Sequence, residues 1–104
     1  MEIKQAENFI NILTKDELKQ IEQVIAATPM QTDIFNLMFK GLDHEDYPDN
    51  KELKKYRKGE RFMRYQLAQF LNVDECTITR EKKKLINRVI HSGILNRLAG
   101  NALI

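Results

Sequence analysis

The second half of this 104-residue chain carries polar and cationic side chains along a stretch with helical periodicity, residues 75–91. Once its apolar positions are assigned to a buried face, the side chains that remain are mostly polar or basic: Glu75, Thr77, Thr79, Arg80, Lys82 and Lys83. A helix with such a surface fits the major groove of DNA, where side chains reach base edges. The sequence therefore predicts recognition of double-stranded DNA, by docking and without covalent chemistry.

Two kinds of contact are expected from this surface. Thr79 and Arg80 lie on the exposed turn of the helix and are predicted to contact bases, because an arginine can form a bidentate contact with guanine. Contacts to phosphates fix register without reading sequence. We assign them to basic side chains on and just before the helix: Arg61, Arg64, Lys82 and Lys83.

The elements that would hold this surface in place resemble a helix-turn-helix. Small or apolar residues stand where two helices joined by a tight turn bury side chains between them: Leu67, Ala68, Leu71, Val73 and Ile78. Ala68 marks the close crossing, Val73 fills the corner after the turn, and Ile78 packs the second helix on the first. Residues 61–71 are predicted to form the first helix, with Asp74 capping the second.

The charges of the chain divide into two blocks. Residues 1–50 carry four Lys against ten Asp or Glu, a balance of −6, whereas residues 51–92 carry twelve Lys or Arg against five acids, a balance of +7. Such asymmetry indicates that the two halves face different partners. Because the basic block contains the expected helix-turn-helix, its charge favours contact with phosphates.

A second basic run precedes the motif, and two interpretations of it stay open. Residues 51–58 are expected to form a short helix that is capped by Asn50 and ends at Gly59. Its cations either widen the phosphate footprint of the motif or form a solvated helix face: Lys54, Lys55, Arg57 and Lys58.

The rest of the chain also predicts helices, so the expected fold class is all-α, a small helical domain of residues 1–104. Residues 1–28 are predicted to form acidic helices, residues 29–92 the motif with its preceding helix, and residues 93–104 a tail helix. Thr14 with Glu17, and Thr28 with Pro29, are helix start signals. The helix that Thr28 opens is expected to end at Gly41.

Composition excludes several classes of protein. Cys76 is the single cysteine, which rules out an internal disulfide or a multi-cysteine zinc site. His44 lies in an acidic loop without the spacing or the glycine of a cation-binding loop, so no metal or other cofactor is expected. No catalytic constellation is present, and an enzyme is not expected. Without a membrane-length apolar run or a signal-peptide pattern, we expect a cytoplasmic, nucleoid-associated protein.

From Pro29 to about Ile90, the chain resembles region 4 of the bacterial sigma-70 family, which reads the −35 promoter element. The resemblance rests on residues 28–42, a proline-led helix that ends in an aromatic, a glycine and a leucine, and on residues 65–78, the helix, the turn and the start of the recognition helix. It implies that Glu75, Cys76, Thr79 and Arg80 face base edges, with Thr77 and Lys83 near the backbone.

The chain also departs from the family pattern. Asn72 replaces the usual turn glycine but tolerates a left-handed backbone. Glu81 stands where an apolar residue is usual, which predicts a rotated or less buried end of the helix. We expect no room for the region that opens promoters, so the resemblance implies a small bacterial, phage- or plasmid-type regulator and not a complete sigma factor.

Two other classes of function stay open. One is a protein-interaction module that binds RNA polymerase or a regulator through the acidic half, with Phe9, Ile10 and Leu13 as a docking face, or through the apolar tail: Ile94, Leu95, Leu98 and Leu103. The same stripes equally fit a core or a homodimer seam, and a dimer is expected if the DNA target is palindromic. The other class is the DNA-binding part of a recombination or replication initiator.

Overall fold

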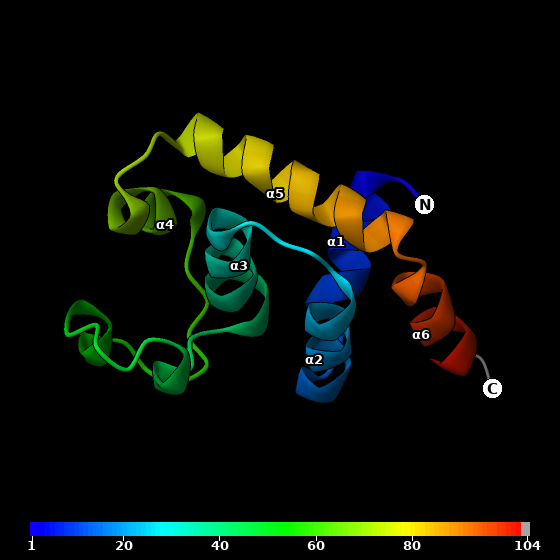
Figure 1. The fold of residues 1–104 in the computed structure, drawn as a ribbon, viewed down its shortest axis with the longest axis horizontal. Coiled ribbons are helices and arrows are strands. Elements are labelled where there is room, and N and C mark those ends of the chain that lie inside the picture. The colour runs from blue at the N-terminus through cyan, green and yellow to red at the C-terminus, as the bar shows by residue number, and fades with distance from the viewer. Residues whose placement is uncertain (103–104) are drawn as a thin grey trace.

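The computed structural model describes the backbone of residues 1–102 and the side chains of residues 1–100. These residues form an all-α fold, in which no strand is described (Figure 1). The α-helices are α1 (Ile3–Asn11), α2 (Lys15–Val24), α3 (Pro29–Ile34), α4 (Arg64–Leu71), α5 (Glu75–His91) and α6 (Ile94–Ala102). The short helical segments are η1 (Phe35–Lys40), η2 (His44–Asp46) and η3 (Glu52–Lys55).

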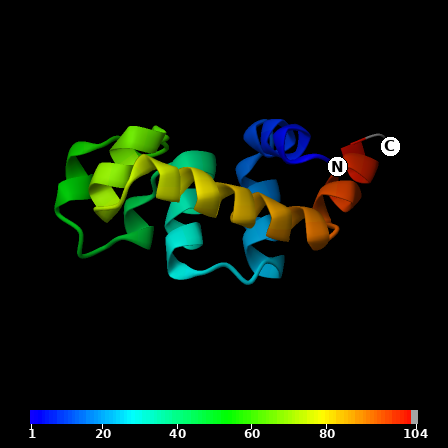
Figure 2. The ribbon, with the colours of Figure 1, turned by 90° about the horizontal axis from the view of Figure 1, so that it is seen from above.

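Helix α5 is the element on which the others pack. It runs along one side of the molecule, and α1, α3, α4 and α6 all contact it (Figures 1 and 2). Its inner stripe is at most 1% exposed, at Ile78, Leu85, Ile86 and Val89. Burying an aliphatic side chain of this size stabilises a fold by about 1.5–3 kcal/mol. The stripe therefore fixes which face of α5 points outward.

The predicted start signals are confirmed at two helices. The Thr14 hydroxyl accepts a hydrogen bond from the Glu17 backbone N–H, and the Glu17 carboxylate accepts one from the Thr14 N–H at 2.9 Å. Thr28 and Gln31 form the same reciprocal pair at the start of α3, where Pro29 occupies the first turn. These bonds satisfy backbone donors that a helix otherwise leaves free.

The helix that Thr28 opens changes character halfway along. It is α-helical to Ile34, and η1 then continues it as a single wide π-turn that ends before Gly41, as the sequence predicts for its end. Within η1, four of the six side chains are buried, including the adjacent Phe35, Asn36 and Leu37. The sequence predicts a helix over this segment, but it does not predict the change from α- to π-geometry at Phe35. A π-turn accommodates this crowding, because it places more residues per turn on the inner side.

The basic helix expected over residues 51–58 is wrong. Only the 3₁₀ turn η3 forms, although the Asn50 side chain does accept hydrogen bonds from the N–H groups of Glu52 and Leu53, as a cap should. The chain becomes extended at Tyr56. The Tyr56 ring packs against the Phe62 ring, with 4.8 Å between the ring centroids. This tertiary contact outweighs the local preference for a helix.

Residues 43–58 form a closed excursion, which we call the insert. The Leu42 N–H donates to the Glu60 carbonyl at 2.8 Å, and the Gly59 N–H donates to the Leu42 carbonyl at 2.6 Å, so the two ends of the insert are joined. Inside it, His44 Nε2 lies 3.1 Å from the carbonyl oxygens of Leu53 and Tyr56. His44 is therefore a structural clip that holds the two halves of the insert together.

Lys40 connects the end of η1 to its neighbours. Its Nζ lies 2.9 Å from an Asp46 carboxylate oxygen in the insert and 3.3 Å from a Glu22 carboxylate oxygen on α2. Burial alone would lower the pKa of Lys40, but the two carboxylates outweigh it and the pKa is raised. The ammonium group thus stays charged and links three segments of the chain.

Several boundaries and caps differ from the sequence-based expectations. The first helix of the expected motif begins at Arg64 and not at residue 61. The backbone is extended at Met63, and the Phe62 N–H donates to the Leu37 carbonyl at 2.7 Å, which ties the segment before α4 to η1. Asp74 does precede α5, but its side chain makes no capping hydrogen bond. The end of α5 is not loosened by Glu81, since Leu85 and Ile86 are fully buried.

The two apolar stripes considered as docking faces lie largely in the core. Ile10 of α1 is 1% exposed, while Phe9 and Leu13 pack at the edge of the core. In α6, Ile94, Leu95 and Leu98 are each at most 3% exposed; Leu103 lies outside the described residues. Among the helices described, none is long and apolar enough to cross a membrane.

The closure of the insert generates the first prediction. Gly41 has a φ of +90°, and a Cβ added there would lie 2.6 Å from the Gly59 carbonyl oxygen, so Gly41→Ala combines left-handed strain with a backbone clash. Strain alone costs roughly 1–3 kcal/mol, and we expect the clash to add to it. Urea unfolding followed by circular dichroism measures the loss.

Gly59→Ala is the matched control, because Gly59 has a φ of +85° but open space around the added Cβ. It should cost only the strain, roughly 1–3 kcal/mol. Equal losses for the two variants would show that Gly41 does not lie against the Gly59 carbonyl, which would contradict the closure of the insert described above.

Candidate nucleic-acid interface

Helices α4 and α5 form a compact unit around a three-residue turn. Asn72 ends α4 in the left-handed conformation, with φ 56° and ψ 50°. This is the conformation that the sequence analysis expected Asn72 to adopt in place of the usual turn glycine. The Val73 N–H then donates to the Ala68 carbonyl at 3.0 Å, which closes the turn. Of the five positions expected between the helices, Leu67 and Ile78 are fully buried and Ala68 is 5% exposed. Leu71 and Val73 are half-buried and pack against the core.

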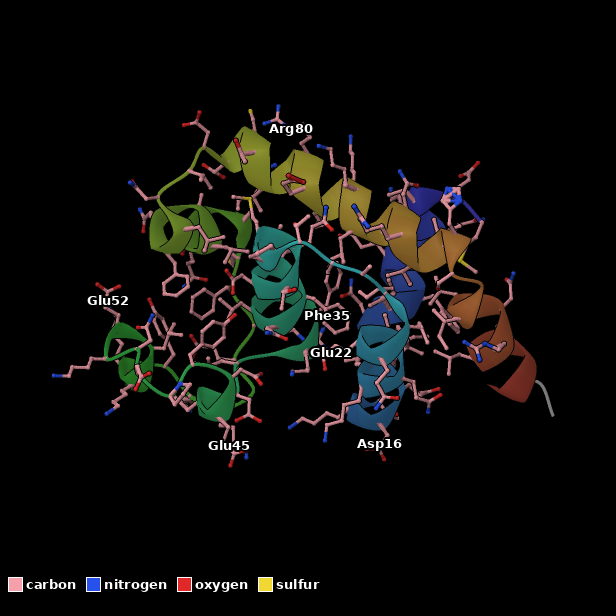
Figure 3. All side chains as sticks on the ribbon, in the orientation of Figure 1. Asp16, Glu22, Phe35, Glu45, Glu52 and Arg80 are labelled. Carbon is pink, nitrogen blue, oxygen red and sulfur yellow. The ribbon has the colours of Figure 1, made fainter. Side chains whose placement is uncertain are left out.

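The outer face of α5 is polar and basic. A shallow concave surface there is lined by side chains of α5 together with one from the start of α4: Arg64, Cys76, Thr79, Arg80, Lys83, Lys84 and Asn87. Arg80 points outward from α5, away from the body of the molecule (Figure 3). Four of the candidate base- and phosphate-contact residues on α5 thus meet on one surface, and Arg64 joins them from α4.

Arg64, Glu75 and Thr79 are linked to one another at this surface. Arg64 Nε donates to a Glu75 carboxylate oxygen at 3.1 Å, and Arg64 Nη1 donates to the Thr79 hydroxyl at 3.2 Å. That hydroxyl donates in turn to the Glu75 carbonyl at 3.2 Å. Because Arg64 and Glu75 are about half exposed, their ion pair contributes little to stability. The contacts can therefore be exchanged for contacts to a ligand at small cost.

Lys82, a predicted phosphate contact, is directed elsewhere. Its Nζ lies 2.9 Å from a Glu7 carboxylate oxygen on α1, and both side chains are less than one-third exposed. Thr77 is half-buried. Of the predicted phosphate contacts on α5, Lys83 alone is exposed and has no ion-pair partner among the described residues.

Two further polar contacts join α5 to the segments that pack against it, and one of them involves Glu81. Glu81 is half-buried, and its carboxylate lies 3.5 Å from Gln31 Nε2 on α3, so a polar pair stands where an apolar contact was expected. Arg88 Nη1 donates to the Ala26 carbonyl at 2.8 Å, which ties the far end of α5 to the linker between α2 and α3.

The remaining candidates lie outside the concave surface. Arg61 is exposed in the extended segment before α4. The basic residues of the insert are exposed as well, but α4 lies between the insert and α5 (Figure 1). The four basic residues of the insert that were expected to widen the phosphate footprint are Lys54, Lys55, Arg57 and Lys58.

Asn87 is a residue of this surface that the sequence reasoning missed. It lies two helical turns after Arg80 and one turn after Lys83, and this spacing places all three on one face of α5. Once the helix was assigned, its periodicity would have identified Asn87. Amide side chains pair with adenine edges, so this side chain adds recognition capacity.

Cys76 is an exposed free thiol. Within the described part of the chain, no group of three His, Cys, Asp or Glu side chains lies close enough together to hold a metal ion. No protein-family model, curated protein or solved structure matches this chain, so the resemblance to sigma region 4 stays a prediction.

Adjacent lysines on α5 provide a test of this geometry. Lys82→Gln breaks the pair with Glu7 and should lower the free energy of unfolding by about 1 kcal/mol, with little effect on DNA affinity. Lys83→Gln should leave unfolding unchanged and weaken binding to any duplex. Chemical denaturation and fluorescence anisotropy measure the two quantities, and the reverse pattern would contradict the assigned orientation of α5.

Proposed function

We propose that this protein binds double-stranded DNA sequence-specifically and regulates transcription, with α5 inserted in the major groove. The proposal rests on one observation, which is that α5 has a buried apolar face and an exposed basic face. Its inner stripe is fully buried, while its outer face holds Arg80 and Lys83, both exposed and free of ion pairs within the described structure. The α4–α5 unit then acts as a helix-turn-helix.

The proposal assigns a role to each side chain of the surface. Arg80 contacts guanine, while Thr79 and Glu75 contact other base edges and Cys76 lies against the groove. Lys83 and Arg64 hold phosphates, with Arg61 at the margin and Thr77 near the backbone. Lys82 supports the interface indirectly, because its pair with Glu7 holds α1 against α5.

In the absence of DNA, the ion pair between Arg64 and Glu75 holds both side chains in one arrangement. The carboxylate of Glu75 would repel a nearby phosphate, and Arg64 offsets that charge at 3.1 Å. When Arg64 contacts a phosphate, Glu75 becomes free to accept a hydrogen bond from cytosine, the base whose amino group suits a carboxylate. Phosphate contact and base reading would in this way be coupled.

The resemblance to sigma region 4 supports a promoter-type target, and it motivates RNA polymerase as a partner. The acidic half provides a surface for such a partner: Asp16 and Glu45 project on the side of the molecule away from Arg80 (Figure 3). A protein could therefore dock there while DNA lies on α5. A homodimer would accompany a palindromic target.

Arg80→Ala tests the assigned base contact. The target is first isolated from a pool of random duplexes, and affinity is then measured by fluorescence anisotropy at several salt concentrations. The substitution should cost about 1–3 kcal/mol on the selected duplex and relax sequence preference at one position. It should change binding to a random duplex much less.

Lys83→Ala is the matched control, because it removes a cation from the same helix face. It should weaken selected and random duplexes alike and reduce the slope of log affinity against log salt by about 1. If the wild-type protein binds no duplex at low salt, the proposed function is wrong and the acidic docking surface becomes the leading candidate.

A further inference from the structure

The basic run of the insert lies away from the surface proposed to bind DNA. A shallow pocket lies between the insert and α4, and its α4 side is formed by Gln66, Gln69 and Phe70. The opposite side of α4 carries Leu67 and Ala68, which are buried. Helix α4 therefore separates the insert from α5, as Figure 1 shows. A straight duplex seated on the outer face of α5 would lie on the opposite side of α4 from these cations.

The cations of the insert are held by a well-packed frame. Leu53 is fully buried, the Tyr56 ring packs on Phe62, and the Tyr47 hydroxyl donates to an Asp33 carboxylate oxygen at 2.7 Å. The backbone bonds between Leu42 and Gly59 close the segment. Ordering each residue costs about 1–2 kcal/mol of backbone entropy. An ordered display of charge differs from a flexible basic tail, since its spacing is fixed before any ligand arrives.

The cations of the insert form no ion pair with any described side chain. Of the cations near α5, Arg64, Lys82 and Lys84 each pair with a carboxylate. Within the described side chains, no ion pair involves the five basic residues of the insert, all of them exposed: Lys51, Lys54, Lys55, Arg57 and Lys58. Residues 51–58 thus carry a net charge of +4, with Glu52 as their one acid, compared with +3 for α5.

The acidic residues of the insert are partly engaged elsewhere. Asp46 pairs with Lys40, and the Asp43 carboxylate accepts a hydrogen bond from the Glu45 N–H at 3.0 Å. Glu45 projects from the side of the molecule where Asp16 also lies, while Glu52 projects from the outer end of the insert (Figure 3). Over the whole insert, residues 43–58, five acids stand against five cations, so the excess of positive charge is confined to residues 51–58.

The surface of the insert suits a phosphate backbone better than a protein. Protein interfaces depend on large apolar or aromatic anchors at their centre. Large exposed apolar side chains of the described chain lie elsewhere, at Met1, Ile12, Val24, Met63 and Tyr65. Binding to a nucleic-acid backbone requires only correctly spaced cations, because it is driven by release of counterions.

We propose that residues 51–58 form a second phosphate-binding surface for duplex DNA, on the far side of α4 from α5. This inference rests on the proposed function of α5. The second segment of DNA is either the flank of the bound site, which bends around α4, or a separate duplex that the protein bridges to the first. In either case one protein molecule contacts DNA on two sides.

The test compares two variants that remove the same charge. Lys54→Gln with Arg57→Gln neutralises the insert, and Lys4→Gln with Arg97→Gln neutralises two exposed residues on α1 and α6, at the other end of the molecule (Figure 1). Each is titrated by anisotropy against a short duplex of about 16 bp, roughly one and a half helical turns, and a long duplex of about 40 bp with the same selected site.

For the long duplex, the insert variant should make the slope of log affinity against log salt shallower by about 2, since each phosphate contact contributes about 0.9. The control variant should match wild type. Energy transfer between dyes at the two ends of the long duplex reports bending, and transfer between dyes on two short duplexes reports bridging. The insert variant should abolish whichever signal wild type gives.

The outcomes separate this inference from the function on which it rests. If the short duplex does not bind, the proposed role of α5 fails. If it binds but the two variants behave alike, or wild type gives neither signal, the inference alone is overturned. Bridging that survives in the insert variant would point to a protein dimer, and this result also overturns the inference.

Discussion

The burial of one stripe along α5 is the constraint on which the rest of this structure depends. Ile78, Leu85, Ile86 and Val89 bind α5 to four other helices, so the helix can neither roll nor slide without exposing them. Removing one such side chain typically costs about 2–5 kcal/mol, a large part of the stability of a small domain. The outward direction of the opposite, polar face follows from this packing.

Cations in this chain serve two distinct purposes. Lys40, Lys82 and Arg88 join segments that are far apart in sequence, through carboxylates or a backbone carbonyl. Arg80 and Lys83 make no such contact among the described residues and remain available to a ligand. Sequence alone cannot separate the two groups, because on α5 both consist of basic residues of one helix. The structure separates them by what each head group touches.

The sequence predicted the features of the fold that depend on residues close together in the chain. The bounds of α5, the paired caps at Thr14 and Thr28, and the left-handed Asn72 follow from periodicity, capping chemistry and backbone preference. The sequence did not predict the features that depend on contacts between residues far apart in the chain. Lys82 finds Glu7 at a separation of 75 residues, Tyr56 leaves the helical conformation to pack on Phe62, and the π-turn accommodates adjacent buried side chains. None of these contacts has a local signature.

The central claim is that the outer face of α5 is the DNA-binding surface. The most direct measurement is a titration of ¹⁵N-labelled protein with a short selected duplex, followed by amide chemical shifts. We predict that the largest changes map to Cys76, Thr79, Arg80, Lys83 and the start of α4 at Arg64, with α2 and α6 nearly unaffected. Changes concentrated on α2 or α6, with the first half of α5 unmoved, would contradict it.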